Sequence, residues 1–323
     1  MIVLVFTGGT ISMRHDPTAG GAVPSLRGHE IVALAPGIDK LASLEIDDWG
    51  AFPGPHMTPS RMWALRERIV AHLARPDVDG VVVTHGTDSL EESAYLMARS
   101  VATEKPIVFT GAMRTSSDLG WDGPGNLGGS VRVAASDEAR GCGTMVVISD
   151  RIYTALDVTK SHTSKLEAFD SPGLGPLGVI DDGQVIFRRA LPSPTSVLSP
   201  PALGEPVDVI YTYSGADSRL LDASRQEGAG VVIAGMGRGN VPPGMVGGIE
   251  RWIAEDKPVV MTSRVARGRV GCTYGYDGGG RRLAELGVIF AGPRRPQQAR
   301  IDVMLALGAR MPVAEIRDLL ESG

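Results

Sequence analysis

The chain has 323 residues and a mass of 34.0 kDa, is 43% hydrophobic and 21% charged, and carries a formal net charge of −5. This length predicts two domains, and the apolar fraction is ample for packed cores, which excludes a disordered or fibrous protein. The 32 basic residues are balanced by 37 acidic ones, which argues against a general nucleic-acid-binding protein, because phosphates require a basic surface.

Membrane insertion, secretion and thiolate chemistry are not expected either. No apolar run approaches the roughly 18–20 residues that cross a bilayer, and the apolar segment Ile2–Phe6 is too short for a secretory signal. The two cysteines, Cys142 and Cys272, lie far apart, which predicts neither a disulfide framework nor a thiolate metal cluster. The histidines are scattered, so we expect no zinc site. A reducing cytoplasm is the expected location.

Short β-branched runs alternate with helical segments in the first half of the chain. The predicted strands are Ile2–Phe6, Gly80–Thr84, Ile107–Thr110 and Met145–Ile148. A helix is predicted after Thr58-Pro59, because four apolar residues share one face of it. These residues are Met62, Leu65, Ile69 and Leu73. A second helix is predicted from Ser89, which has capping-box spacing to Glu92. This alternation indicates a parallel sheet covered on both faces, a doubly wound α/β fold.

The segment 191–206 contains five prolines and no periodicity, which is typical of an extended interdomain linker. After it, strands are predicted at Val207–Tyr211, Val231–Ala234 and Val259–Thr262, and helices at Arg300–Leu307 and Val313–Leu320. We therefore expect two doubly wound domains: a larger N-terminal catalytic α/β domain with a parallel sheet (1–190) and a smaller C-terminal α/β domain (207–323). The arginine-rich stretch Gly292–Arg295 is expected to be a solvated loop.

Several common catalytic motifs are absent from the sequence. There is no P-loop, no Gly-x-Ser-x-Gly nucleophile elbow and no His-Glu-x-x-His pair. Polar residues instead follow the predicted strands, where the carboxyl ends of a doubly wound sheet bind ligands. Thr7-Gly8-Gly9-Thr10 comes directly after the first strand. Its glycines allow a close backbone approach to a ligand and leave the Thr10 hydroxyl on a loop, although a simple turn explains them equally well.

Two further segments carry groups suited to catalysis. Thr84-His85-Gly86-Thr87-Asp88 ends a predicted strand and offers a hydroxyl beside a carboxylate. Asp88 or Ser89 could simply cap the next helix, but a carboxylate here could also bind an ammonium group. In Asp157-Val158-Thr159-Lys160 the lysine is either a solvated side chain or, if buried near Thr87, a base that takes its proton.

Together these segments resemble the bacterial-type L-asparaginases over essentially the whole chain. The matching segments, in the family's order, are Thr7–Ile11, Val83–Ser89, Phe109–Arg114, Asp157–Lys160 and Gly237–Asn240, followed by the tail Pro296–Ala299. The resemblance implies hydrolysis of a side-chain amide to a carboxylate and ammonia through a covalent acyl-enzyme, without metal or cofactor. It also implies a homo-oligomer, a dimer or tetramer, in which neighbouring subunits share active sites.

The resemblance assigns a role to individual residues. Thr10 matches the nucleophilic threonine, Thr87 and Lys160 match the second threonine and its partner lysine, and Asp88 matches the carboxylate that binds the substrate's α-ammonium. Backbone groups of Gly111-Ala112-Met113 lie where oxyanion stabilisation is expected, with Ala112 bordering the amide. Asn240 matches an asparagine that reaches the site of a neighbouring subunit.

Two positions depart from the family pattern. Ala22 stands where the loop after the nucleophile usually carries a tyrosine, and a methyl group cannot orient a hydroxyl. Gly54 stands where a serine meets the substrate's α-carboxylate, and the following Pro55 has no N–H to replace it. Both changes concern substrate recognition, so Gly54 and Pro55 are expected to line the substrate-binding site.

We therefore expect a cytoplasmic, homotetrameric or dimeric amidohydrolase that acts on L-asparagine. One alternative is the same hydrolysis with a different amide or lactam as substrate. A second is a catalytically impaired amino-acid-binding protein, which would not need Lys160. A third is the related amidotransferase subunit that acts on charged transfer RNA. We expect it least, since that subunit carries an additional N-terminal domain and this chain is acidic.

Overall fold

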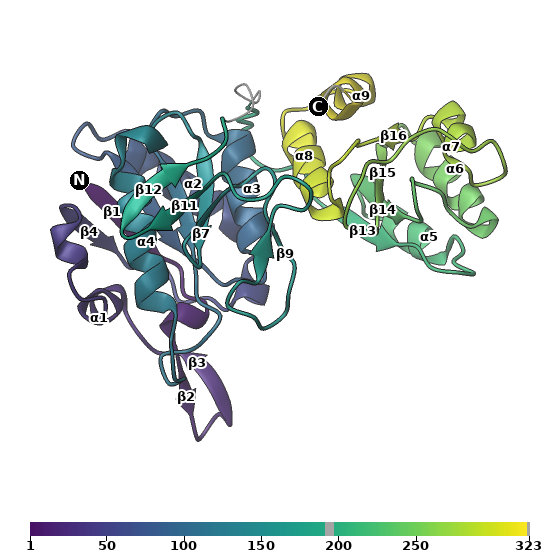
Figure 1. The fold of residues 1–323 in the computed structure, drawn as a ribbon. Helices are drawn as coiled ribbons and strands as arrows, with labels where there is room; N and C mark the ends of the chain where they lie inside the picture. The colour runs from purple at the N-terminus through teal and green to yellow at the C-terminus, as the bar shows by residue number, and fades with distance from the viewer. Residues whose placement is uncertain (191–196, 322–323) are drawn as a thin grey trace. The chain divides into compact units, whose positions relative to one another are not determined.

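A mixed β-sheet organises the first part of the molecule in the computed structural model, which describes residues 1–190 and 197–321. The chain divides into two units, Met1–Val197 and Leu198–Gly323. Within the described residues, the sheet of the first unit has eight strands in the order β12-β11-β8-β7-β6-β5-β1-β4 (Figure 1). Their bounds are β1 Ile2–Phe6, β4 Leu44–Asp47, β5 Gly80–Thr84, β6 Ile107–Thr110, β7 Thr144–Ile148, β8 Arg151–Thr154, β11 Gly178–Asp181 and β12 Gln184–Phe187.

The strands from β4 to β7 are parallel, which confirms the predicted doubly wound sheet. Strands β8, β11 and β12 add an antiparallel edge that the sequence analysis did not predict. Two-residue turns reverse the chain there, Ser149-Asp150 between β7 and β8 and Asp182-Gly183 between β11 and β12. All four residues have positive φ, as the tight turns of hairpins require.

Helices cover both faces of this sheet (Figure 1). They are α1 Gly28–Ala33, α2 Pro59–Leu73, α3 Leu90–Ser100 and α4 Gly123–Ala135. Alternate residues of a strand point to opposite faces, and Ile2, Leu4 and Phe6 of β1 share one core with Leu127 and Val131 of α4. Helices α2 and α3 lie on the other face. The parallel strands are therefore buried on both sides, as their continuous apolar runs predict.

The two helices predicted in the first half of the chain are confirmed, but the predicted side-chain cap of the second is wrong. All four residues of the predicted apolar face of α2 are buried, and its N-cap Thr58 accepts the Arg61 N–H at 3.3 Å. Helix α3 follows Ser89, yet the Ser89 side chain caps no helix N–H. Its hydroxyl instead donates to the carbonyl of Gly54 at 2.7 Å. The predicted side-chain cap by Ser89 does not form, and its hydroxyl makes a tertiary hydrogen bond instead.

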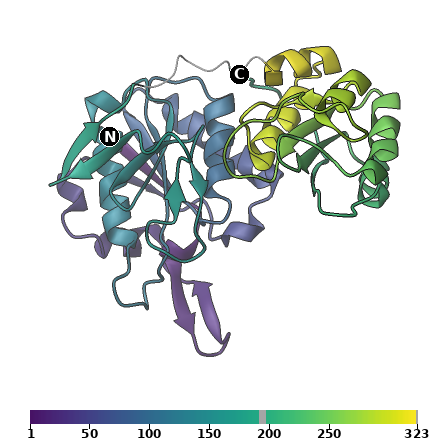
Figure 2. The same ribbon diagram turned by 45° about the vertical axis from the view of Figure 1, so that its right-hand side comes forward.

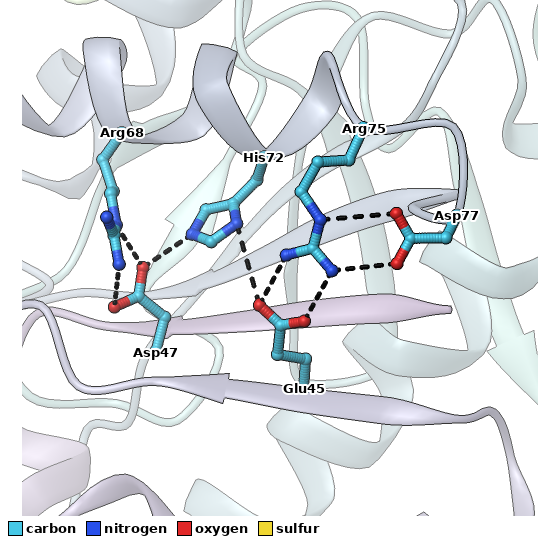
Figure 3. A network of polar contacts seen from close by, with 6 residues as sticks. All are labelled: Glu45, Asp47, Arg68, His72, Arg75 and Asp77. Atoms are coloured by element: carbon cyan, nitrogen blue, oxygen red, sulfur yellow. Dashed lines mark hydrogen bonds and ion pairs between the residues drawn. The ribbon is translucent and has the colours of Figure 1, made fainter.

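Ion pairs attach the edge strand β4 to α2 and the turn after it. Figure 3 shows the six side chains of this network: Glu45, Asp47, Arg68, His72, Arg75 and Asp77. Asp47 binds Arg68 Nε and His72 Nε2, each at 2.7 Å, and Glu45 holds Arg75 through two bonds of 2.7 and 2.8 Å. Burial tends to raise the pKa of Asp47, but hydrogen bonds from Arg68 and His72 outweigh burial and lower it.

A hairpin follows Thr10 and projects from the first unit in both views (Figures 1 and 2). It consists of β2 Met13–Asp16 and β3 Gly21–Pro24, with Ala22 exposed and opposite His15. Its base is anchored, because the Met13 carbonyl accepts the Ser116 N–H at 3.0 Å and the Ser116 hydroxyl at 2.9 Å. The segment expected to be the loop after the nucleophile is therefore an ordered hairpin.

The second unit is built on a smaller parallel sheet. Its described residues form four strands in the order β13-β14-β15-β16, all parallel, with helices on both faces (Figure 1). The elements are β13 Val207–Tyr211, α5 Arg219–Arg225, β14 Gly230–Gly235, α6 Val246–Ala254, β15 Val259–Ser263, α7 Gly280–Leu286, β16 Ile289–Phe290, α8 Pro296–Gly308 and α9 Val313–Glu321. The predicted strands and closing helices are confirmed, although α8 begins four residues earlier than expected.

Two predictions near the second unit have different outcomes. The predicted linker 191–206 begins with residues 191–196, which lie outside the described part of the chain, so the linker stays a prediction. The stretch Gly292–Arg295 is not a solvated loop. Arg294 is 11% exposed, pairs with the fully buried Asp302 at 2.8 Å and donates to the carbonyl of Leu320 at 2.7 Å. Arg294 thereby ties α8 to α9.

Candidate active site

The candidate catalytic residues follow neighbouring parallel strands of the first unit. Thr10 begins a 3-10 turn, Thr10–Ser12, shortly after β1, and Thr87 and Asp88 follow β5. Ala112 comes directly after β6 and Gly111. Because β1, β5 and β6 are adjacent and parallel, their carboxyl ends lie at one edge of the sheet, where ligands bind in doubly wound folds.

Glycines bring the loops at this edge into direct backbone contact. A Cβ on Gly9, which has φ 80°, would lie 2.5 Å from the Cα of Gly86. A Cβ on Gly86 would in turn lie 2.5 Å from the Cα of Gly54. Real Cβ atoms do not approach other atoms this closely, so glycine is required for the three segments to pack. The loops carrying Thr10, Thr87 and Gly54 therefore meet.

Lys160 joins the site from a separate element. It belongs to β9 Thr159–Lys160, which pairs with β10 Phe169–Asp170. Lys160 Nζ donates to Thr87 Oγ1 at 2.8 Å and to Asp88 Oδ1 at 2.7 Å. The lysine side chain is 18% exposed and that of Asp88 60% exposed, while Thr87 is buried. The structure thus brings together a hydroxyl, an amine and a carboxylate that are separated in sequence.

The Thr10 hydroxyl is available for chemistry. Thr10 is partly exposed, and its side chain forms no hydrogen bond with any residue that the structure describes. The neighbouring hydroxyls, by contrast, are engaged in holding the backbone. Thr7 Oγ1 donates to the Thr84 carbonyl and Ser12 Oγ to the Gly9 carbonyl, each at 2.8 Å. Thr7 and Ser12 therefore shape the loop, and Thr10 presents its oxygen.

Gly54 lies beside Asp88. Gly54 is buried in the short turn Gly54–His56, and a Cβ on it would lie 3.2 Å from the Asp88 Cβ. Its carbonyl is occupied by the Ser89 hydroxyl. Pro55 is exposed and has no N–H. Positions 54 and 55 therefore offer a substrate neither a hydroxyl nor a charged side chain.

The loop after β6 is held by two residues that the sequence analysis missed. Asp122 accepts the backbone N–H groups of Met113 at 3.0 Å and Arg114 at 2.9 Å. Asn126 Nδ2 donates to the Gly111 carbonyl at 2.9 Å. Because the Met113 N–H is engaged, it cannot serve the oxyanion, and the N–H groups of Gly111 and the buried Ala112 are left as the candidates of the predicted trio. No local signal distinguishes Asp122 and Asn126, because their partners lie in another loop.

His85 lies beneath the site as a neutral, buried ring. Its Nδ1 donates to the Gly86 carbonyl at 2.9 Å, so Nε2 accepts from the Ser93 hydroxyl at 2.9 Å. Desolvation lowers the pKa of His85 from its ordinary 6.5 to about 4, against the opposing hydrogen bond to Gly86. The neutral ring supports the loop that carries Thr87.

The shifted pKa of His85 predicts an acid-sensitive fold. Between pH 6.5 and about 4 the unfolded chain binds a proton at His85 that the native state excludes, so the free energy of unfolding falls by up to about 3 kcal/mol as pH decreases across this window. Urea unfolding at several pH values measures this effect. In His85→Asn the free energy of unfolding should depend less steeply on pH, by the equivalent of about one bound proton. His29→Asn, at an exposed position, should keep the wild-type pH dependence of the free energy of unfolding. The same wild-type pH dependence in His85→Asn would refute the prediction.

Asn240 lies in the second unit, in a turn after β14. Its Oδ1 accepts the Gly280 N–H at 3.1 Å, and its backbone carbonyl accepts the Met236 N–H at 2.8 Å. Its predicted role at a neighbouring subunit's site stays a prediction. Within residues 1–190 and 197–321, no cluster of His, Cys, Asp or Glu side chains is suited to hold a metal ion. Among the same residues, no helix combines the length and the apolar character that a membrane span requires.

Comparison with known proteins identifies similar sequences over the whole chain. Residues 1–193 match the family model described as "Asparaginase, N-terminal", and residues 206–320 match that of the "Glutaminase/Asparaginase C-terminal domain". The chain is 35% identical over 327 residues to a probable L-asparaginase from Deinococcus radiodurans, covering 100% of this chain and 97% of that protein. It is 34% identical over 312 residues to an L-asparaginase from Bacillus licheniformis, covering 95% of each.

A solved structure shares the fold. The crystal structure of a probable cytoplasmic L-asparaginase from Campylobacter jejuni matches with a TM-score of 0.89 at 30% sequence identity, over 99% of this chain and 98% of that one. The similarity therefore extends over both units, including the segments that carry Thr10, Thr87 and Lys160.

Proposed function

Since the chain belongs to the asparaginase family of amidohydrolases, we propose that it hydrolyses L-asparagine to L-aspartate and ammonia through an acyl-enzyme on Thr10. The observation that carries the proposal is the contact of Lys160 Nζ with both Thr87 and Asp88 at the sheet edge where Thr10 lies. A threonine is a weak nucleophile that needs proton transfer to and from its surroundings. A lysine beside a buried hydroxyl supplies a route for such transfer.

The proposed reaction has two steps, formation of an ester on Thr10 and its hydrolysis by water. Thr10 Oγ attacks the amide carbon, the carbon–nitrogen bond breaks, and the hydroxyl proton is delivered to the departing nitrogen to give ammonia and a threonine ester. Water then attacks the ester carbon, returns a proton to Thr10 Oγ and releases the carboxylic acid. Thr87 and Lys160 move protons in the two steps. The Ala112 N–H would stabilise the oxyanion that forms in each of them.

Asp88 is proposed to bind the α-ammonium of the substrate. Lys160 occupies Oδ1 at 2.7 Å, and the 60% exposure of the carboxylate leaves room for a second cation. A charge-assisted hydrogen bond of this kind is among the stronger ones in proteins. The absence of a side chain at Gly54 favours, as a second candidate, an amide that lacks the α-carboxylate.

We further propose that the protein is a cytoplasmic homo-oligomer in which Asn240 completes the site of a neighbouring subunit. The relative with a similar structure is described as cytoplasmic. Several exposed tyrosines of the second unit support a covered surface there, because large exposed apolar groups mark interaction sites. They are Tyr211, Tyr213, Tyr274 and Tyr276.

The test compares ammonia release from L-asparagine with release from two analogues that each lack one group. Succinamate lacks the α-ammonium, and we expect its kcat/KM to be lower by roughly 10–100-fold, because a charge-assisted hydrogen bond to Asp88 is worth about 1.5–3 kcal/mol. 3-Aminopropanamide lacks the α-carboxylate, and its loss should be smaller because Gly54 offers that group no side chain. L-Glutamine is assayed in parallel as the longer homologue.

Each outcome has a distinct meaning. Fastest release from L-asparagine supports the proposed activity, and fastest release from 3-aminopropanamide supports the alternative substrate class. If folded protein binds L-asparagine in a calorimeter but releases no ammonia from any of these amides, the protein is a binding protein and the proposed hydrolysis is wrong.

A further inference from the structure

Lys160 lies at the end of a very short strand. In the described part of the chain, β9 has two residues and pairs with β10 in a two-stranded sheet apart from the eight-stranded one. Its register joins Lys160 to Phe169 and Thr159 to Asp170. Such a short ribbon gives little backbone support, yet proton transfer requires Nζ to stay within hydrogen-bond reach of its partner.

A carboxylate of α3 holds the backbone of Lys160 itself. Glu91 Oε2 accepts the backbone N–H of Lys160 at 2.7 Å. Glu91 is the second residue of α3, three residues after Asp88, and is half-buried. Lys160 is therefore held at two points: at its backbone by Glu91 of α3, and at Nζ by Thr87 and Asp88 in the turn before the helix.

We propose that Glu91 is a positioning residue that holds the Lys160 backbone so that Nζ reaches Thr87. This inference rests on the proposed function, because it assigns Glu91 a part in the proton transfer by Lys160. Thr87 and Asp88 lie in the turn that precedes α3, so the bond from Glu91 ties the Lys160 backbone to the helix that follows this turn. Misplacement of a reacting group by about 1 Å can cost about 10²-fold in rate.

A neighbouring residue provides a matched comparison. Ser89 also donates one buried tertiary hydrogen bond from the start of α3, but its partner is the Gly54 carbonyl at 2.7 Å. Loss of that bond would release the Gly54 turn beside Asp88 and leave the hydrogen bonds of Lys160 in place. Glu91 should therefore affect the chemical step, and Ser89 should affect substrate binding.

The experiment measures kcat, KM and the solvent deuterium isotope effect on kcat for ammonia release by the full chain. We expect Glu91→Ala to lower kcat about 10–100-fold with KM within about threefold, and to raise the isotope effect because proton transfer becomes slower. Glu91→Gln keeps an oxygen acceptor and should retain at least about half of the wild-type kcat. Ser89→Ala should mainly raise KM, and Glu67→Ala, 58% exposed on α2, should behave as wild type.

The outcomes separate this inference from the proposed function. If wild type releases no ammonia from any amide, the proposed function fails. If wild type is active but Glu91→Ala stays within twofold of it, or loses activity with an unchanged isotope effect, positioning by Glu91 is overturned and the hydrolase stands. A loss in Glu91→Gln equal to that in Glu91→Ala would show that the charge matters rather than the hydrogen bond, and would overturn it too. Circular dichroism and Tm verify that each variant is folded.

Discussion

Replacement of Thr10 by alanine is expected to abolish ammonia release while leaving the protein folded. The proposed acyl-enzyme forms on Thr10 Oγ, and loss of a nucleophile costs on the order of 10³–10⁶-fold in kcat. Stability should change by less than about 0.5 kcal/mol, typical of partly exposed positions, because the hydroxyl bonds to no residue that the structure describes. Steady-state kinetics with L-asparagine and thermal unfolding of the same preparation measure both effects.

Thr7→Val is the matched control for Thr10→Ala. The Thr7 hydroxyl is buried and donates to the Thr84 carbonyl at 2.8 Å, so its loss should destabilise the fold by about 1–3 kcal/mol and leave activity within a few-fold. The two threonines, three residues apart, thus have opposite expected profiles. More than a tenth of wild-type kcat remaining in Thr10→Ala would contradict the assignment of the nucleophile.

Replacement of Lys160 by methionine is expected to lower kcat by about 10²–10⁴-fold, the usual contribution of a general base or acid. Methionine has a similar length but neither donates to Thr87 nor pairs with Asp88. The measurement is kcat for L-asparagine, together with calorimetric binding of L-aspartate, which reports whether the site still binds ligand.

Lys160→Arg distinguishes proton transfer from fixed charge. Arginine keeps a cation beside Asp88 but does not give up its proton in proteins. We therefore expect Lys160→Arg to fold and bind L-aspartate, yet to turn over as slowly as Lys160→Met. Near-wild-type turnover by Lys160→Arg would mean that the lysine serves as a fixed positive charge.

Much of the fold could be predicted because its signals are local. Strands β1, β5 and β6 lie at their predicted bounds, since a strand buried on both faces requires an unbroken β-branched run. Thr10, Thr87 and Asp88 could be found because they follow such strands, and the carboxyl ends of parallel strands meet at one edge. The other site residues were predicted from the family resemblance. The antiparallel edge was not predicted, although Asp182-Gly183 between β11 and β12 is a hairpin signal.

Long-range contacts decided what local patterns could not. Ser89 has the sequence of a helix cap, but the approach of Gly54 offers its hydroxyl a buried carbonyl instead. Arg294 has the sequence of a solvated loop residue, but the fully buried carboxylate of Asp302 requires a cation. In both cases the partner that decides the structure lies outside the window that a sequence pattern covers.

By itself, the sequence determined the strand runs, the glycine-rich turns after them and the chemical types of the groups at the site. The family resemblance paired Lys160 with Thr87, but only the tertiary structure shows their contact, across 73 residues of the chain, and that Glu91 holds the Lys160 backbone. The physical reason is the separation along the chain over which each interaction acts. Burial and backbone periodicity act between near neighbours and are visible in sequence, whereas a hydrogen bond of 2.8 Å exists only where folding brings two distant groups together.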